Sequence, residues 1–155
     1  MNELPKILID SREQTPLEFP GYETEGASLT AGDYSLYGLK ELVAIERKAL
    51  PDLVRCCTNS ERDRFKRELH RLQAYRCKGV VIEACFQDAL QGNYKSQLNP
   101  NALIASVSSW QLKYNVPFIW AGTPDGAARA TIELLTQFFK QCQKFAKILN
   151  KEGIK

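Results

Sequence analysis

The chain has 155 residues, of which 44% are hydrophobic and 25% are charged. These values are typical of one globular domain, and no stretch approaches the roughly 18 apolar residues of a membrane span. The N-terminal residues include an acidic side chain and only a brief apolar run, which is not the pattern of a secretory signal. We therefore predict a single cytoplasmic domain over residues 1–155.

The net charge of +3 conceals an asymmetry along the chain. Residues 1–60 hold 6 Lys and Arg against 10 Asp and Glu, whereas residues 61–155 hold 15 against 8. An acidic segment beside a basic one is expected for a metal site next to a polyanion-binding surface, although a chance drift of surface charge gives similar numbers. The five cysteines include no CxxC pair and the chain has one histidine, so we expect reduced thiols rather than a zinc site.

Strands dominate the first third of the chain. Residues 6–10 (KILID) form an apolar run that ends in Asp10, and residues 11–32 are mostly loop with room for one edge strand. DYSLYG (33–38) and LVAIERK (42–48) have strand composition, and the turn between them around residues 39–40 predicts a β-hairpin.

Helices and strands alternate in the remainder. A helix is predicted to start near Leu50 and Pro51, and a second, N-capped by Ser60, to cover residues 60–75. The later predicted elements are a strand over 79–84, a helix over 99–114 and a strand over 117–121. The order predicts an α/β fold with helices flanking a mixed central sheet.

One long helix is predicted over about 124–150, after a core of about 6–122. Its apolar side chains form one stripe, which Phe138 and Phe145 widen. The residues of the stripe, at spacings of four and three, are Ala128, Ile132, Leu135, Phe139, Cys142, Ala146 and Leu149. So wide a stripe favours a helix contact between two copies of the chain, and the alternative is that all of it packs on its own domain. No Gly-rich phosphate loop occurs, so no nucleotide cofactor is expected.

The hairpin brings two carboxylates together. If its loop is centred on residues 39–40, Tyr37 pairs with Leu42 and paired positions sum to 79, which places Asp33 opposite Glu46 with Cβ atoms about 4.5–5.5 Å apart. Side chains alternate along the second strand, so Glu46 and Lys48 share one face and Arg47 points to the other. A three-residue loop would break this register.

Opposed like charges destabilise a hairpin unless a cation lies between them. Mg²⁺ is commonly held by one or two carboxylates together with waters and phosphates, and Asp10 is a candidate third carboxylate from the neighbouring strand. Carboxylates around a divalent metal, with Lys48 near the attacking water or the scissile phosphate, are the requirements of phosphodiester hydrolysis. The alternative is a surface ion pair of Glu46 and Lys48 with Asp33 as a turn residue.

Three segments resemble the nuclease domain of the XPF family of structure-specific endonucleases, which includes the archaeal Hef nuclease. They are ILIDSRE (7–13), GDYSL (32–36) and ERKALPD (46–52), in the family's order and spacing. The resemblance is weaker from there to about residue 135. It implies a restriction-endonuclease-like (PD-(D/E)XK) core, Mg²⁺ or Mn²⁺ as cofactor, DNA cleavage near a junction or flap, and a homodimer.

The resemblance also assigns roles to individual residues. Asp10, Asp33 and Glu46 are implied as metal ligands and Lys48 as a cation that orients water or phosphate. Arg47 is implied as a phosphate contact or a structural partner, and Asp52 as a support residue of the active site. Arg12 and Glu13 belong to the first motif with uncertain roles; we group Arg12 with the predicted DNA contacts.

Two features separate this chain from the family pattern. It has KRE where the family commonly has a glutamine in the basic helix, and no paired helix-hairpin-helix modules occur in these 155 residues, so we expect a minimal stand-alone form. DNA contacts are then expected from the basic helix at 61–78, with seven Lys and Arg against three acidic residues and Arg64, Arg67 and Arg71 as candidates. His70 is expected to be an ordinary surface residue.

Two other functions remain open at this stage. One is a non-catalytic DNA-binding or scaffold subunit of an XPF-like dimer, and the presence of a competent residue at every motif position argues against it. The other is a nuclease that acts on RNA or on plain duplex without structural preference.

Overall fold

The computed structural model describes residues 3–153 and contains a six-stranded mixed sheet in the order β2-β1-β3-β4-β5-β6. The strands are β1 (Ile7–Asp10), β2 (Thr24–Ala27), β3 (Tyr34–Leu36), β4 (Val43–Lys48), β5 (Cys77–Ile82) and β6 (Phe118–Trp120). β3 is antiparallel to both β1 and β4, and the remaining pairs are parallel. This confirms the predicted α/β class with a mixed central sheet.

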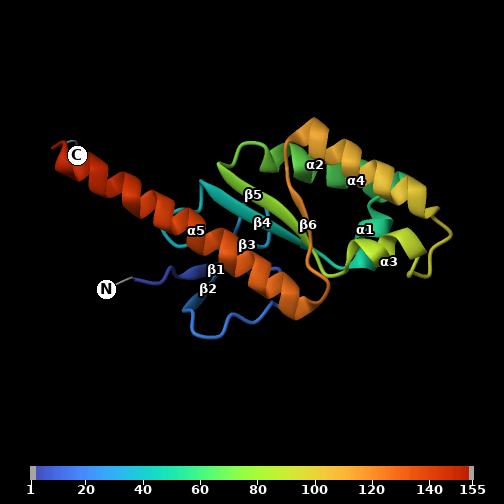
Figure 1. Cartoon of the computed structure of the whole chain (residues 1–155), viewed down its shortest axis with the longest axis horizontal. Coiled ribbons are helices and arrows are strands. Elements are labelled where there is room, and N and C mark those ends of the chain that lie inside the picture. The colour runs from blue at the N-terminus through green and yellow to red at the C-terminus, as the bar shows by residue number, and fades with distance from the viewer. Residues whose placement is uncertain (1–2, 154–155) are drawn as a thin grey trace.

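Five helices cover the two faces of the sheet (Figure 1). They are α1 (Leu50–Arg55), α2 (Asn59–Leu72), α3 (Phe86–Gln91), α4 (Pro100–Tyr114) and α5 (Pro124–Lys151). α3 was not predicted; it has only six residues, too few for an apolar period to be visible in the sequence. The predicted cap of the second helix was wrong, because α2 is preceded by Thr58 and Ser60 lies inside its first turn.

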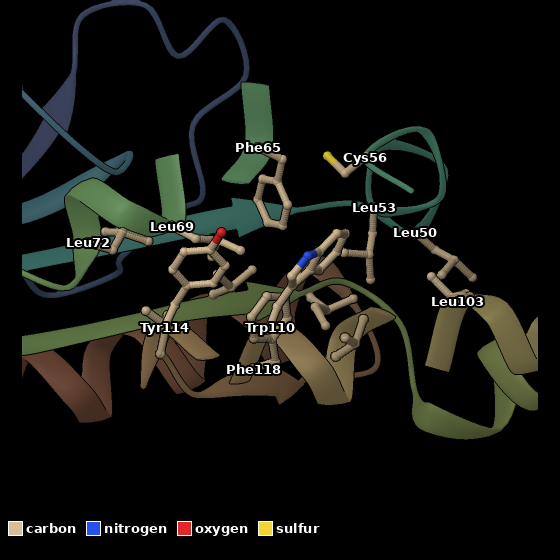
Figure 2. Close-up of a cluster of buried hydrophobic side chains, with 14 of the residues drawn as sticks. Leu50, Leu53, Cys56, Phe65, Leu69, Leu72, Leu103, Trp110, Tyr114 and Phe118 are labelled. Carbon is tan, nitrogen blue, oxygen red and sulfur yellow. The ribbon is translucent and has the colours of Figure 1, made fainter. Parts of the chain in front are cut away.

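One core cluster lies between the sheet and the helices α1 to α4. Figure 2 shows its centre, where Phe65 of α2 and Trp110 of α4 meet edge to face with ring centroids 5.2 Å apart. Ala44 joins this cluster from β4, so the face of β4 that carries Ala44 also carries Glu46 and Lys48 under α2.

A second cluster lies on the other face, under α5. Val43 and Ile45 of β4 pack there with Leu135 and Phe138 of α5. Because alternate residues of β4 enter different clusters, the strand is buried on both sides and reads as an apolar run until Glu46. The predicted division of its charges between two faces is confirmed.

The hairpin register is confirmed, and its turn differs from the prediction. Tyr34 pairs with Ile45, and these positions sum to 79 as predicted. The strands end earlier than expected, because the Leu39 and Leu42 amides donate to the Leu36 and Leu39 carbonyls in a longer turn. The predicted ladder pair of Tyr37 and Leu42 was therefore wrong, and both side chains are exposed.

No helix within residues 3–153 is long and apolar enough to cross a lipid bilayer.

Candidate active site

Asp33 is positioned by the glycine that precedes it. Gly32 has φ +73°, a conformation that L-residues rarely adopt, and a Cβ there would lie 3.1 Å from both the amide nitrogen and the carbonyl oxygen of Ile45. The absent side chain lets this segment lie against β4, where the Asp33 amide donates to the Ile45 carbonyl at 2.8 Å. In the Gly-Asp pair of the second motif, the glycine thus allows the backbone to lie close to β4, and this position of the backbone places the aspartate carboxylate.

A pocket of about 270 Å³, where β1, β3 and β4 meet α2, contains four of the predicted catalytic residues: Asp10, Asp33, Glu46 and Lys48. Its charged lining residues are Asp10, Arg12, Glu13, Asp33, Glu46, Lys48, Arg64, Glu68 and Arg71. Three different strands or strand ends and one helix therefore contribute to one pocket, as the sequence motifs require.

Asp33 and Glu46 both have raised pKa values. Burial raises the pKa of Asp33 to about 6, although the Arg47 amide donates to its Oδ2 atom at 2.8 Å. Burial, followed by the charge of Asp33, raises the pKa of Glu46 to about 8. Two carboxylates that resist ionisation side by side form a site that a divalent cation would stabilise.

Lys48 remains a cation in this pocket. Its Nζ atom lies 3.4 Å from Glu46 Oε1 and 3.8 Å from Glu68 Oε2, with the Phe65 ring 5.1 Å away. Burial alone lowers the pKa of Lys48, but Glu46 and the other negative groups around it raise the pKa above its ordinary value. Lys48 therefore offers a positive charge to an anion and is not a proton acceptor at neutral pH.

Asp10 is held by hydrogen bonds on both carboxylate oxygens. Arg12 Nε donates to Oδ2 at 2.8 Å, and the Leu29 amide donates to Oδ1 at 3.1 Å. Burial raises the pKa of Asp10, yet these two donors outweigh burial and leave it below its ordinary value. Asp10 is thus ionised and paired with Arg12, whose own side chain is 75% exposed.

A model of the ERCC4 domain matches residues 9–138 of this sequence. The chain belongs to the ERCC4 domain family. No curated protein matches the sequence. The match to this family confirms the resemblance that the three motifs indicated.

Two solved structures share this ERCC4 fold. XPF from Aeropyrum pernix superposes with a TM-score of 0.70 at 19% identity, over 92% of this chain and 69% of that chain. XPF from Aeropyrum pernix in complex with DNA gives a TM-score of 0.68 at 22% identity, over 88% of this chain and 66% of that chain. These matches confirm the restriction-endonuclease-like core.

The three predicted metal ligands of the ERCC4 domain line one pocket but differ in availability. Asp33 and Glu46 face each other, whereas Asp10 is bonded to Arg12. Across residues 3–153, no three Asp, Glu, His or Cys side chains are arranged closely enough to hold a metal ion together. The donor chemistry still fits Mg²⁺ or Mn²⁺, because such ions are held by one or two carboxylates and complete their shell with water and phosphate oxygens.

Glu68 was missed by the sequence interpretation. Its Oε2 atom is buried, has no hydrogen-bond partner within residues 3–153, and lies 3.8 Å from Lys48 Nζ. Its position in the sequence could have indicated it, because Glu68 follows Phe65 by three residues on the apolar face of α2, where a carboxylate needs a partner. An orphaned buried carboxylate oxygen beside two other carboxylates also fits a site that takes a cation.

Arg47 lies outside the pocket, on the opposite face of β4. It forms ion pairs with Glu13, at 3.2 Å, and with Glu83, and it donates to the Thr15 carbonyl. Tyr34 donates its hydroxyl to the same Glu13 carboxylate at 3.0 Å. Of the two roles that the resemblance implied for Arg47, these contacts favour the structural partner; Glu83 was missed because it follows β5, remote in sequence.

The remaining predicted residues lie in the main pocket or in one of two hollows next to it. Asp52 pairs with Arg55 one helical turn away and lines a smaller pocket beside Lys48 and Glu68, so it lies next to the main pocket and not in it. Arg64 and Arg71 line the main pocket, whereas Arg67 does not and instead lies in a hollow farther along α2.

Proposed function

We propose that this chain is an Mg²⁺- or Mn²⁺-dependent DNA endonuclease that hydrolyses phosphodiester bonds at branched or flap DNA. The observation that carries the proposal is the pocket in which Asp33 and Glu46, both with raised pKa values, lie beside the cation Lys48. Membership of the ERCC4 domain family supports the same reaction class.

Some residues of the pocket would bind the metal, and others would bind phosphate. Asp33 and Glu46 would hold the divalent ion, which when bound would stabilise charge on the scissile phosphate and lower the pKa of an attacking water. Lys48 would bind a nonbridging phosphate oxygen. Arg64 and Arg71 of α2 line the pocket and would bind phosphates of the DNA backbone.

Asp10 has a conditional role in this proposal. Its carboxylate is bonded to Arg12, and Arg12 is mostly exposed. When a DNA phosphate accepts from Arg12, one oxygen of Asp10 becomes available as a third ligand. The motif residues Asp10 and Arg12 would then couple DNA binding to completion of the metal site.

A substrate panel with wild type and Lys48→Ala tests the proposal. Labelled flap, fork, plain duplex and single-stranded RNA are incubated with Mg²⁺, Mn²⁺ or EDTA. We expect metal-dependent cutting of the flap or fork, and a loss of at least about a hundredfold in Lys48→Ala, since a preorganised charge on the transition state is worth about 10²–10³ in rate.

Other outcomes have distinct meanings. Equal cutting of RNA and plain duplex would contradict the preference for branched DNA. DNA binding without cutting under either metal would instead support a non-catalytic subunit of a dimer.

We also propose that the chain forms a homodimer through the far end of α5. Its first half packs on the sheet with Leu135 and Phe138 buried, whereas Phe145 and Ile148 are 62% and 51% exposed where the helix projects past the sheet (Figure 1). Phe145, which widens the predicted stripe, and Ile148, which was not part of it, are thus exposed apolar side chains that a partner would cover.

Sedimentation tests the dimer directly. Wild type at micromolar concentration is expected to sediment with twice the mass of one chain, and Phe145→Asp as a monomer. The matched control is Lys147→Asp, which adds the same side chain to the same part of α5 and is expected to remain dimeric. A monomeric wild type would contradict the proposal.

A further inference from the structure

A second hollow lies between α2 and α4, outside the catalytic pocket. It measures about 460 Å³ and is lined by Lys66, Arg67, His70, Arg71, Lys113 and Tyr114. Four of these six side chains are permanent cations, and the lining includes no Asp or Glu. The hollow joins two helices that are separated in sequence by residues 73–99, so the basic helix alone did not reveal it.

The cations of the hollow have no acidic partners in the described part of the chain. No carboxylate of residues 3–153 forms an ion pair with Lys66, Arg67, Arg71 or Lys113, whereas Arg64, on the same helix, pairs with Glu61 and Glu68. Arg67 and Arg71 are also spaced i,i+4, where like charges destabilise a helix. These cations lower the stability of the helix and their positive charge is not compensated by a carboxylate. The hollow is therefore suited to bind an external anion.

Tyr114 forms the floor of the hollow. Its side chain is 7% exposed and packs in the same core cluster as Leu69 and Leu72 of α2, and Figure 2 shows its ring beside them. Lys113 Nζ lies over this ring, 5.3 Å from its centroid. The hydroxyl makes no hydrogen bond with another residue of the described chain, so a donor is available beside the cations.

Arg71 connects the hollow to the catalytic pocket, because its side chain lines both. A polyanion that places one phosphate beside Lys48 can therefore extend past Arg71 into a hollow whose lining contains no acidic side chain. DNA has this chemistry, with a negative charge at every nucleotide of each strand.

We propose that the hollow between α2 and α4 binds backbone phosphates of the DNA that flanks the scissile bond, with Lys113 and Tyr114 of α4 completing the site begun by Lys66, Arg67 and Arg71. The inference rests on the proposed function for the identity of the anion. It adds a residue pair from a second helix and a direction for the DNA, from the catalytic pocket along α2 towards the C-terminal end of α4.

DNA binding without metal tests this site independently of cleavage. Affinity for a labelled 20-base-pair duplex is measured in EDTA over a series of salt concentrations, for wild type, Lys113→Gln and Arg67→Gln. Each substitution is expected to make the slope of log affinity against log salt shallower by about 0.9, and to weaken binding about tenfold at 50 mM salt. Lys95→Gln, an exposed lysine outside both linings, is the matched control and is expected to bind like wild type.

Three results would overturn the inference: wild-type affinity and slope in both variants, an equal loss in Lys95→Gln, or no duplex binding by wild type. Unchanged melting temperatures in the variants show that a loss of binding is not a loss of fold. Because the assay contains no metal and no turnover, a chain that binds through the hollow but fails to cut any substrate would refute the proposed function and leave this site intact.

Discussion

Glu46→Gln is expected to abolish DNA cleavage and at the same time to raise the melting temperature of the metal-free protein. The substitution removes one of two opposed carboxylates whose pKa values are raised by burial, and the charge of Asp33 raises the pKa of Glu46 further. Loss of metal-assisted charge stabilisation is worth several kcal/mol, so the rate should fall by at least about a hundredfold. A residue that merely supports the fold would lower activity and stability together.

The sign of the stability effect follows from the direction of the pKa shifts. A carboxyl group whose pKa is higher in the folded state contributes stability at pH values below its ordinary pKa, and that contribution disappears as pH rises through the folded value. Metal-free wild type should therefore lose stability as pH rises from about 4 to about 8, between the ordinary and the raised pKa values of Asp33 and Glu46. Glu46→Gln should show a weaker fall over this window, with about 2–4 °C gained for each kcal/mol recovered.

Metal titration completes the test. Mg²⁺ or Mn²⁺ should raise the melting temperature of wild type by mass action, since ions that bind the folded state stabilise it. Neither ion should do so in Glu46→Gln or in Asp33→Asn. Glu133→Gln is the control, because within the described residues Glu133 forms an ion pair only with exposed Arg129, and neutralising it should change neither the metal response nor the pH profile. A Glu46→Gln protein that melts lower than wild type without metal would contradict the account of this pair.

The hairpin shows why part of this site was predictable. The order of side chains along β4 is fixed by strand geometry, and the register of Asp33 against Glu46 depends only on how the two strands pair. Both were therefore available from local sequence, even though the turn itself was predicted in the wrong form. The position of Gly32 against Ile45 explains why that register is kept when the strands are short.

Residues brought in by tertiary packing were harder to predict. Glu68 enters the pocket because α2 packs Phe65 and Leu69 on the sheet. No local sequence pattern predicts the angle at which the helix packs. Glu83 meets Arg47 because β5 lies parallel to β4, a pairing made across a long crossover. The bond between Asp10 and Arg12 is local, but that both oxygens of Asp10 accept hydrogen bonds becomes visible only when the Leu29 amide is seen to lie beside the other oxygen.

Arg47→Met is expected to destabilise the fold strongly, and it reaches the catalytic pocket only through Glu13, which lines that pocket and pairs with Arg47. The guanidinium is 19% exposed and holds two carboxylates, Glu13 and Glu83, that are 20% and 10% exposed. Removing one partner from a mostly buried ion pair leaves uncompensated charge, at a cost of about 3–5 kcal/mol when burial is complete and about 2–4 kcal/mol here because water still reaches the groups. Urea unfolding is the measurement.

A double-mutant cycle separates this structural role from phosphate binding. Glu83→Gln removes one orphaned charge, so Arg47→Met combined with Glu83→Gln should cost less than the sum of the two single changes. Arg129→Met is the matched control, since it breaks an exposed i,i+4 pair with Glu133 that is worth at most about 0.5 kcal/mol. If Arg47→Met unfolds like this control but loses DNA affinity, Arg47 is a phosphate contact. If it loses stability and the cycle shows coupling to Glu83, then Glu46 and Lys48 are catalytic side chains on one face of β4, and Arg47 stabilises the fold on the other face.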